Sequence, residues 1–209
     1  MKIAVIGANG RVGGLVVKEA LSRGYEVTGI VKDKSSVDGI SVIEKDIMSL
    51  TQSDLIIFDA VINCFGVWDE SKFDLYTTTT KHLCDILSNT KVRLLIVGGA
   101  GSLFVNPEHT IQVVDTEGFP EEYKALATAA SKALTYLRGR DDVQWTYLSP
   151  AGNFDANGTR TGSYILGGEE AIVNSKGESY ISYADYAIAM VDEIKNANHI
   201  QKRFSVVSE

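Results

Sequence analysis

A short apolar run, KIAVI at residues 2–6, leads directly into a turn with glycine at every third position: Gly7, Gly10 and Gly13. Gly7 permits a sharp turn after a strand, and Gly13 allows the following helix to pack closely on that strand. Gly10 leaves backbone N–H groups accessible at the helix N-terminus, where negative charge is favoured. The motif therefore predicts a strand–turn–helix unit that binds a pyrophosphate.

Along the rest of the chain, short runs rich in Val and Ile alternate with longer helical patterns. The strand-like runs are residues 26–31, 41–46, 59–66, 92–101, 143–150 and 203–207, and the helical patterns are residues 12–24, 73–89, 121–140 and 184–197. Runs that are apolar on both faces are typical of parallel strands covered by helices on both sides. The alternation predicts an α/β fold with a doubly wound parallel sheet and helices on both faces.

The two ends of this pattern carry local signals. In the first helix we expect Val12, Leu15 and Val16 to face inward and Lys18 and Glu19 to face outward, with a stop at Gly24. Ser182 followed three residues later by Asp185 is typical of an N-terminal cap for the last helix. Residues 151–181 are rich in Gly and Asn and are too long for a simple connection, so we expect them to form a small substrate lobe. A chain of 209 residues otherwise fits a single domain, 1–209.

Composition excludes several partners. The net charge of −7 argues against a nucleic-acid-binding surface or an anionic membrane surface. No apolar run reaches the roughly 18–20 residues of a membrane-spanning helix, and the N-terminus does not continue as a signal peptide, so we expect a cytoplasmic protein. Two further residue types carry no metal-ligand chemistry in this pattern. Cys64 and Cys84 lie in apolar patterns and are expected to be buried free thiols.

The three histidines are widely separated in the sequence, so we predict no metal site.

Cofactor contacts are expected at the carboxyl ends of the strands, where ligands of open α/β sheets lie. Lys32 follows the second strand, where a basic residue suits the 2′-phosphate of NADP, so NADP(H) is favoured over NAD(H); if Asp33 faces the ribose instead, the preference reverses. Asp46 and Ile47 follow the third strand and are candidates for the adenine ring. The full set of predicted cofactor residues is Gly7, Asn9, Gly10, Arg11, Val12, Lys32, Asp46, Ile47, Cys64, Phe65, Gly66, Gly98 and Gly99.

These features together resemble one protein family. GANGRVG, IVKDK, VGGAGSL, WTYLSPA, RTGSYILG and SYISYADYAIAMVDEI are similar to stretches of the atypical short-chain dehydrogenase/reductases, in the NAD(P)H-binding subgroup of NADH-flavin reductases, biliverdin/flavin reductase B and NmrA-like proteins. The resemblance covers nearly the whole chain. It implies a Rossmann-like fold that binds NADP(H), with a substrate above the nicotinamide at the strand ends.

The chain departs from this superfamily at the catalytic tyrosine. Typical members use Tyr-x-x-x-Lys, in which the lysine lowers the tyrosine pKa for proton exchange with a carbonyl oxygen. The residue four before Lys132 is Thr128, and Tyr123 is nine positions away. Ser102, Tyr123 and Lys132 remain candidates to contact substrate, although each also fits a structural role. Trp68, Phe73 and Phe154 are candidates to stack on a planar substrate.

Two functions of different classes remain. The first is an NADPH-dependent reductase of flavin-like or quinone-like acceptors, which need only a hydride from the cofactor. The second is a redox sensor of the NmrA type, which binds NADP(H) without turnover and docks on a protein partner. A sugar-nucleotide epimerase is disfavoured because the tyrosine is missing. The sequence is compatible with a monomer or a homodimer.

Overall fold

The computed structural model describes residues 1–33, 37 and 39–209. Within these residues the main sheet has eight strands in the order β3-β2-β1-β4-β5-β6-β10-β8, and β7 pairs with β9 in a separate small sheet. The strands are β1 (Lys2–Ile6), β2 (Glu26–Val31), β3 (Ser41–Glu44), β4 (Ala60–Asn63), β5 (Arg93–Val97), β6 (Gln144–Ser149), β7 (Asn153–Asp155), β8 (Tyr164–Gly167), β9 (Tyr180–Ser182) and β10 (Lys202–Ser208). The α-helices are α1 (Arg11–Ser22), α2 (Gln52–Leu55), α3 (Asp74–Leu87), α4 (Glu121–Arg138) and α5 (Tyr183–Asn196).

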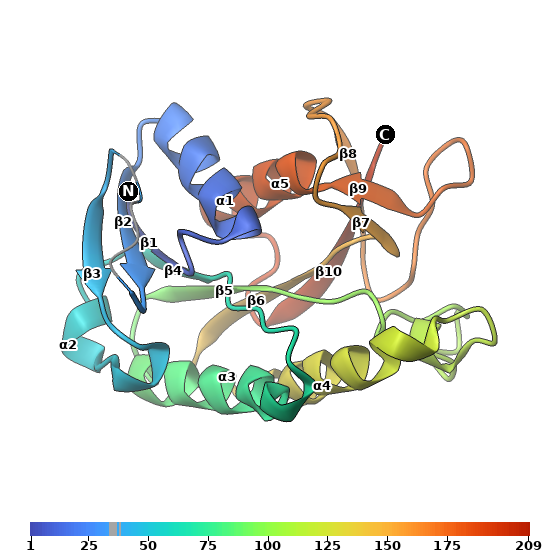
Figure 1. Cartoon of the computed structure of the whole chain (residues 1–209), viewed down its shortest axis with the longest axis horizontal. Helices are drawn as coiled ribbons and strands as arrows, with labels where there is room; N and C mark the ends of the chain where they lie inside the picture. The colour runs from blue at the N-terminus through green and yellow to red at the C-terminus, as the bar shows by residue number, and fades with distance from the viewer. Residues whose placement is uncertain (34–36, 38) are drawn as a thin grey trace.

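Two layers of helices cover the sheet, with α1 and α5 on one face and α3 and α4 on the other (Figure 1). Strand β1 shows why both faces are apolar. Ile3 and Val5 join the core under α1 and α5, whereas Ala4 and Ile6 join the core under α3 and α4. The Rossmann-like α/β fold expected from the alternation is confirmed.

The expected parallel sheet has one antiparallel strand, at its edge. Every pairing from β3 to β10 is parallel, but β8 runs antiparallel to β10, with Leu166 opposite Val206. Part of the segment predicted as a substrate lobe, residues 151–181, therefore belongs to the main sheet. The apolar run at 164–166 gives β10 a hydrogen-bonding partner, because β10 would otherwise be an unpaired edge. The short strands β7 and β9 come from the same segment.

The first helix follows the expected pattern except at Glu19. Gly24 ends the helix with φ +73°, a conformation that favours glycine, and Val16 is fully buried. Lys18 is exposed, as expected. The Glu19 side chain, in contrast, is only 11% exposed, because Arg23 and Arg160 both form ion pairs with its carboxylate.

Other features bear on the expectations for cysteines and for membrane partners. Cys84 is buried and Cys64 is partly buried, and both are free thiols. Burial raises the pKa of the Cys64 thiol to about 12, so it is protonated at neutral pH. No helix among the described residues is long and apolar enough to cross a membrane.

Candidate functional site

The glycine turn lies at the point where the strand order reverses, between β1 and β4. Gly7 follows β1 with φ +72°, and its N–H donates to the carbonyl of Ile30 at 2.9 Å. A Cβ atom on Gly13 would lie 2.1 Å from the Gly7 carbonyl oxygen, so the close approach of helix and turn requires glycine there. Gly7 also lies against the Cys64 backbone at the end of β4. Ligands of open α/β sheets bind at such a switch point.

The first turn of α1 is open to an anion. Gly10 is the N-cap residue, no side chain caps the helix, and the first turn contains no acidic residue. The N–H groups of a first helical turn have no partners within the helix. Together with the helix dipole, such N–H groups favour the binding of an anion such as phosphate. Asn9 and Gly10 are exposed, and Val12 is partly buried against the core.

Arg11 is the first residue of α1, and its side chain extends toward the C-terminal segment. One guanidinium N–H donates to Asn157 Oδ1 at 3.3 Å, and the guanidinium carbon lies 5.8 Å from the centre of the Tyr183 ring. Tyr183 is the first residue of α5. Because α5 packs against α1, β5 and β10, Arg11 lies on the α5 side of the turn.

The residues predicted to contact the adenosine lie at the ends of β2 and β3. Lys32 Nζ lies 3.2 Å from Asp46 Oδ2, with the Lys32 side chain 74% exposed. The other carboxylate oxygen of Asp46 accepts the backbone N–H of Met48 at 2.8 Å. This backbone hydrogen bond, followed by the contact with Lys32, lowers the Asp46 pKa. Ile47 follows in the same turn, whereas Lys34 of the IVKDK stretch lies outside the described residues.

The segments that follow β4 and β5 both contain glycine, at Gly66 and at Gly98 and Gly99. Cys64 and Phe65 are partly buried, and Gly66 is exposed. A Cβ atom on Gly98 would lie 2.2 Å from the ring of Tyr147. The Tyr147 hydroxyl accepts the Gly99 N–H at 3.1 Å and is deeply buried, and that burial raises its pKa to about 12. Tyr147 therefore acts here as a fixed support for the two glycines.

Aromatic side chains stand on both sides of these strand ends. On one side Phe65 and Phe73 pack edge-on against Tyr76, with ring centres 5.7 Å and 6.3 Å away. On the other, Phe154 lies 4.1 Å from Tyr183 between ring centres. Trp68, the third predicted aromatic, is 72% exposed.

Sequence reasoning missed Tyr76 and Tyr183. Tyr76 lies in the first turn of α3, and its hydroxyl bonds the backbone of Val67 in the loop after β4. Tyr183 is the first residue of α5. Both helices begin at the carboxyl edge of the sheet, so an aromatic residue in the first turn was the available signal.

The three candidate catalytic residues occupy different environments. Ser102 is buried, and its hydroxyl and carbonyl oxygens accept from the Arg203 guanidinium at 3.4 Å and 3.3 Å. Tyr123 is 47% exposed in the first turn of α4, and Lys132 is exposed farther along that helix. No hydrogen bond joins any two of these described residues. A catalytic role for any of them stays a prediction.

Comparison with known proteins shows the family. Residues 7–197 match the model of a family described as NAD(P)H-binding, and the chain belongs to that family. The chain is 48% identical to YwnB of Bacillus subtilis (strain 168), with 100% of this chain and 99% of YwnB covered. The expected membership of an NAD(P)H-binding family is thereby confirmed.

Solved structures agree with this assignment. The structure of a putative NADH-flavin reductase from Streptococcus pneumoniae TIGR4 matches with 44% identity, full coverage of both chains and a TM-score of 0.97. A putative epimerase from Bacteroides thetaiotaomicron matches with 34% identity, 99% and 96% coverage and a TM-score of 0.83. Relatives with this fold thus carry names from two reaction classes.

Proposed function

We propose that this protein is an NADPH-preferring reductase that transfers hydride to a planar acceptor such as a flavin or a quinone. The observation that carries the proposal is the uncapped first turn of α1, which contains no acidic residue and follows a glycine turn at the strand-order reversal, against the Cys64 backbone after β4. The family and the name of the Streptococcus relative support the same reaction class.

A reduced nicotinamide supplies the hydride in such a reaction, and the protein supplies binding and orientation. Gly98 makes room for the Tyr147 ring, and the Tyr147 hydroxyl fixes the backbone at Gly99 after β5. Phe65 and Tyr76 from one side, and Phe154 and Tyr183 from the other, present ring surfaces that suit a planar acceptor. A flavin or quinone takes up its proton from water, so no Tyr-x-x-x-Lys pair is required.

The decisive experiment mixes the purified protein with NADPH or NADH and a panel of acceptors, namely FMN, dichlorophenolindophenol and a soluble quinone. We expect the reduced nicotinamide to be oxidised only when an acceptor is present. The reaction is measured as the loss of the absorbance of the reduced nicotinamide. Micromolar NADPH binding with no oxidation across the panel would reject the reductase and favour the redox sensor.

Cofactor choice is tested by Lys32→Asp. The pairing of Lys32 with Asp46 holds an ammonium group at the end of β2, where a 2′-phosphate would lie. We expect the preference for NADPH over NADH to fall roughly tenfold or more, because a charged hydrogen bond is replaced by a repulsion. Lys2→Asp, at the amino end of β1 and away from the carboxyl ends of the strands, makes the same change in net charge and is the matched control. An unchanged ratio of the two affinities in the Lys32 variant would refute the role of Lys32.

A further inference from the structure

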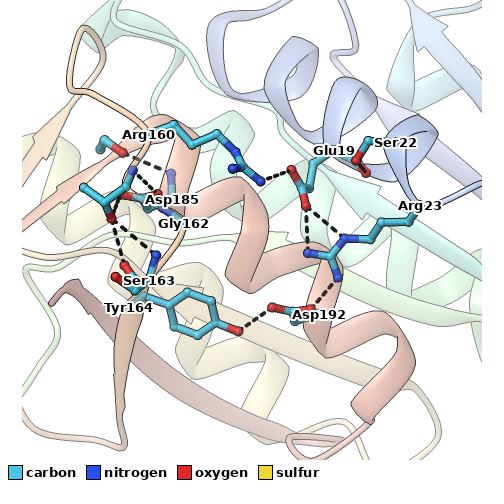
Figure 2. A network of polar contacts seen from close by, with 11 residues as sticks. Glu19, Ser22, Arg23, Arg160, Gly162, Ser163, Tyr164, Asp185 and Asp192 are labelled. Carbon is cyan, nitrogen blue, oxygen red and sulfur yellow. Dashed lines mark hydrogen bonds and ion pairs between the residues drawn. The ribbon is translucent and has the colours of Figure 1, made fainter.

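One stretch of the C-terminal segment, residues 156–162, lies along α1 and is called the strap below. Asn157 contacts Arg11 at the first turn of α1. Arg160 forms an ion pair with Glu19 two turns later, at 3.1 Å (Figure 2). Arg11 and Glu19 are about 12 Å apart along the helix axis. Three residues of extended chain span up to about 10 Å, so the strap follows the helix with its side chains supplying the remaining reach.

The Glu19 end of the strap is held by a network of charges. Glu19 accepts two hydrogen bonds from Arg23 at 2.9 Å and 2.7 Å. Arg23 also pairs with Asp192 of α5, which in turn accepts the Tyr164 hydroxyl at 2.6 Å (Figure 2). Glu19 therefore presents a carboxylate of fixed orientation to Arg160, and this network links α1, α5 and β8.

The far end of the strap is held by a buried carboxylate. Asp185 of α5 is fully buried and accepts the backbone N–H groups of Thr161 and Gly162 at 3.0 Å and 2.9 Å. Its other oxygen accepts the Thr161 hydroxyl at 2.8 Å. A buried carboxylate is costly unless such donors satisfy it, so the chain at 161–162 is strongly fixed. The strap is thus anchored at two points beyond Asn157.

We propose that the strap is a positioning device for Arg11. Its two anchors hold Asn157, and Asn157 together with the Tyr183 ring holds the Arg11 guanidinium on the α5 side of the helix N-terminus. There Arg11 binds the phosphate on the nicotinamide side of the cofactor diphosphate. Arg160 and Asp185 act through Arg11 and do not touch the cofactor. This inference rests on the proposed function, because it needs a dinucleotide at the first turn of α1.

The contacts of Arg11 show that Asn157 can hold the guanidinium without competing with a phosphate for it. A guanidinium has several N–H donors in a rigid fork, and only one of them is accepted by Asn157. Stacking on Tyr183 uses the face of the group and leaves its edge donors in place. A phosphate can therefore join Asn157 on the same guanidinium without displacing it.

The test measures two affinities by titration calorimetry in wild type and in the variants Arg160→Ala, Arg160→Lys and Asn157→Ala. The Arg160 side chain is 56% exposed, so its replacement leaves the core intact. The probes are NADPH and adenosine 2′,5′-bisphosphate, which lacks the nicotinamide-side phosphate. Lys124→Ala, which breaks an exposed ion pair with Glu121 in the first turn of α4, is the matched control.

We expect the Kd for NADPH to rise roughly three- to tenfold in Arg160→Ala and in Asn157→Ala. The Kd for adenosine 2′,5′-bisphosphate should stay within about twofold, and Arg160→Lys should recover most of the loss. A purely structural role for the strap would weaken both ligands equally.

Three results would overturn the inference: an unchanged NADPH affinity in both alanine variants, tighter NADPH binding in Asn157→Ala, or equal weakening of the two ligands. The first two would leave the proposed function standing, because wild type still binds the cofactor. A wild-type protein that binds neither NADPH nor NADH would overturn both proposals.

Discussion

Helices α1 and α5 lie side by side on one face of the sheet, but their N-termini are built differently (Figure 1). At α5 the Ser182 hydroxyl accepts the Asp185 N–H at 3.0 Å, and Asp185 adds a negative charge to the first turn. At α1 the N-cap residue is Gly10, with no side-chain cap and no acidic residue. Helix α5 therefore provides a side-chain acceptor for its own first turn, whereas α1 does not.

This difference suits the two helix ends to different roles. The unpaired N–H groups of a first turn are satisfied by side chains, water or a ligand. Ser182 and Asp185 make the α5 end unsuitable for an anion, whereas the α1 end has Arg11 as its charged residue and a glycine turn before it. The strap joins the two ends, because Asp185 holds one part of it and Arg11 contacts another.

The largest expected effect comes from closing the α1 turn sterically. In Gly13→Ala the new Cβ would lie 2.1 Å from the Gly7 carbonyl oxygen, so the helix must move away from the turn. We expect a loss of roughly 3 kcal/mol in the free energy of unfolding, measured by urea denaturation, together with loss of NADPH binding.

Gly14→Ala is the control for this substitution. Its Cβ would lie 3.6 Å from the nearest atom, the Ala8 carbonyl oxygen, which is an ordinary contact. Alanine is the better helix former by about 1 kcal/mol, so this variant should be slightly more stable and should bind NADPH normally. Equal stability of the two alanine variants would contradict the close approach at Gly13.

A second variant gives the N-terminus of α1 an acidic side chain, as the N-terminus of α5 has. Gly10 has φ −78° and ψ 171°, a conformation that other residues adopt, so Gly10→Asp adds an acidic cap. Its Cβ would lie 3.1 Å from the Gly7 carbonyl oxygen, so the turn must shift by a few tenths of an ångström, as it must in the serine variant below. We expect a small change in stability but a roughly tenfold rise in the Kd for NADPH, because the carboxylate repels the diphosphate. Gly10→Ser adds a neutral cap, and an effect on Kd as large as that of Asp would show that charge at this end is unimportant.

Features that depend on neighbouring residues could be predicted from the sequence. The Gly7–Gly13 turn, the stop at Gly24 and the cap at Ser182 each arise from backbone requirements within a few residues. The alternation of apolar runs also predicted the Rossmann-like sheet, because a strand that is buried on both faces is a continuous run of apolar residues.

Features that depend on distant pairings could not be predicted. The Asp185 carboxylate was expected to complete a local cap, but it accepts from Thr161 and Gly162, 24 and 23 residues away. The environment of Glu19 depends on Arg160, 141 positions later in the chain. Such contacts are set by how the C-terminal segment folds back over α1, and no spacing within either segment encodes them.

The smallest expected effect comes from removing the cap of α5. Ser182→Ala leaves the Asp185 N–H without its acceptor in a buried site, and we expect a loss of about 1 kcal/mol in stability. For a chain of this length that corresponds to a fall of roughly 2–4 °C in Tm, which calorimetry resolves. Ser22→Ala, near the end of α1, removes an exposed hydroxyl that donates to the Glu19 carbonyl at 2.7 Å, and it should change stability less because this site is open to water. Because the Asp185 carboxylate still holds the strap, NADPH affinity should stay within about twofold of wild type. If Ser182→Ala weakened NADPH binding as much as Gly10→Asp, the two helix ends would not be separable, and the α5 N-terminus would have to be counted as part of the cofactor site.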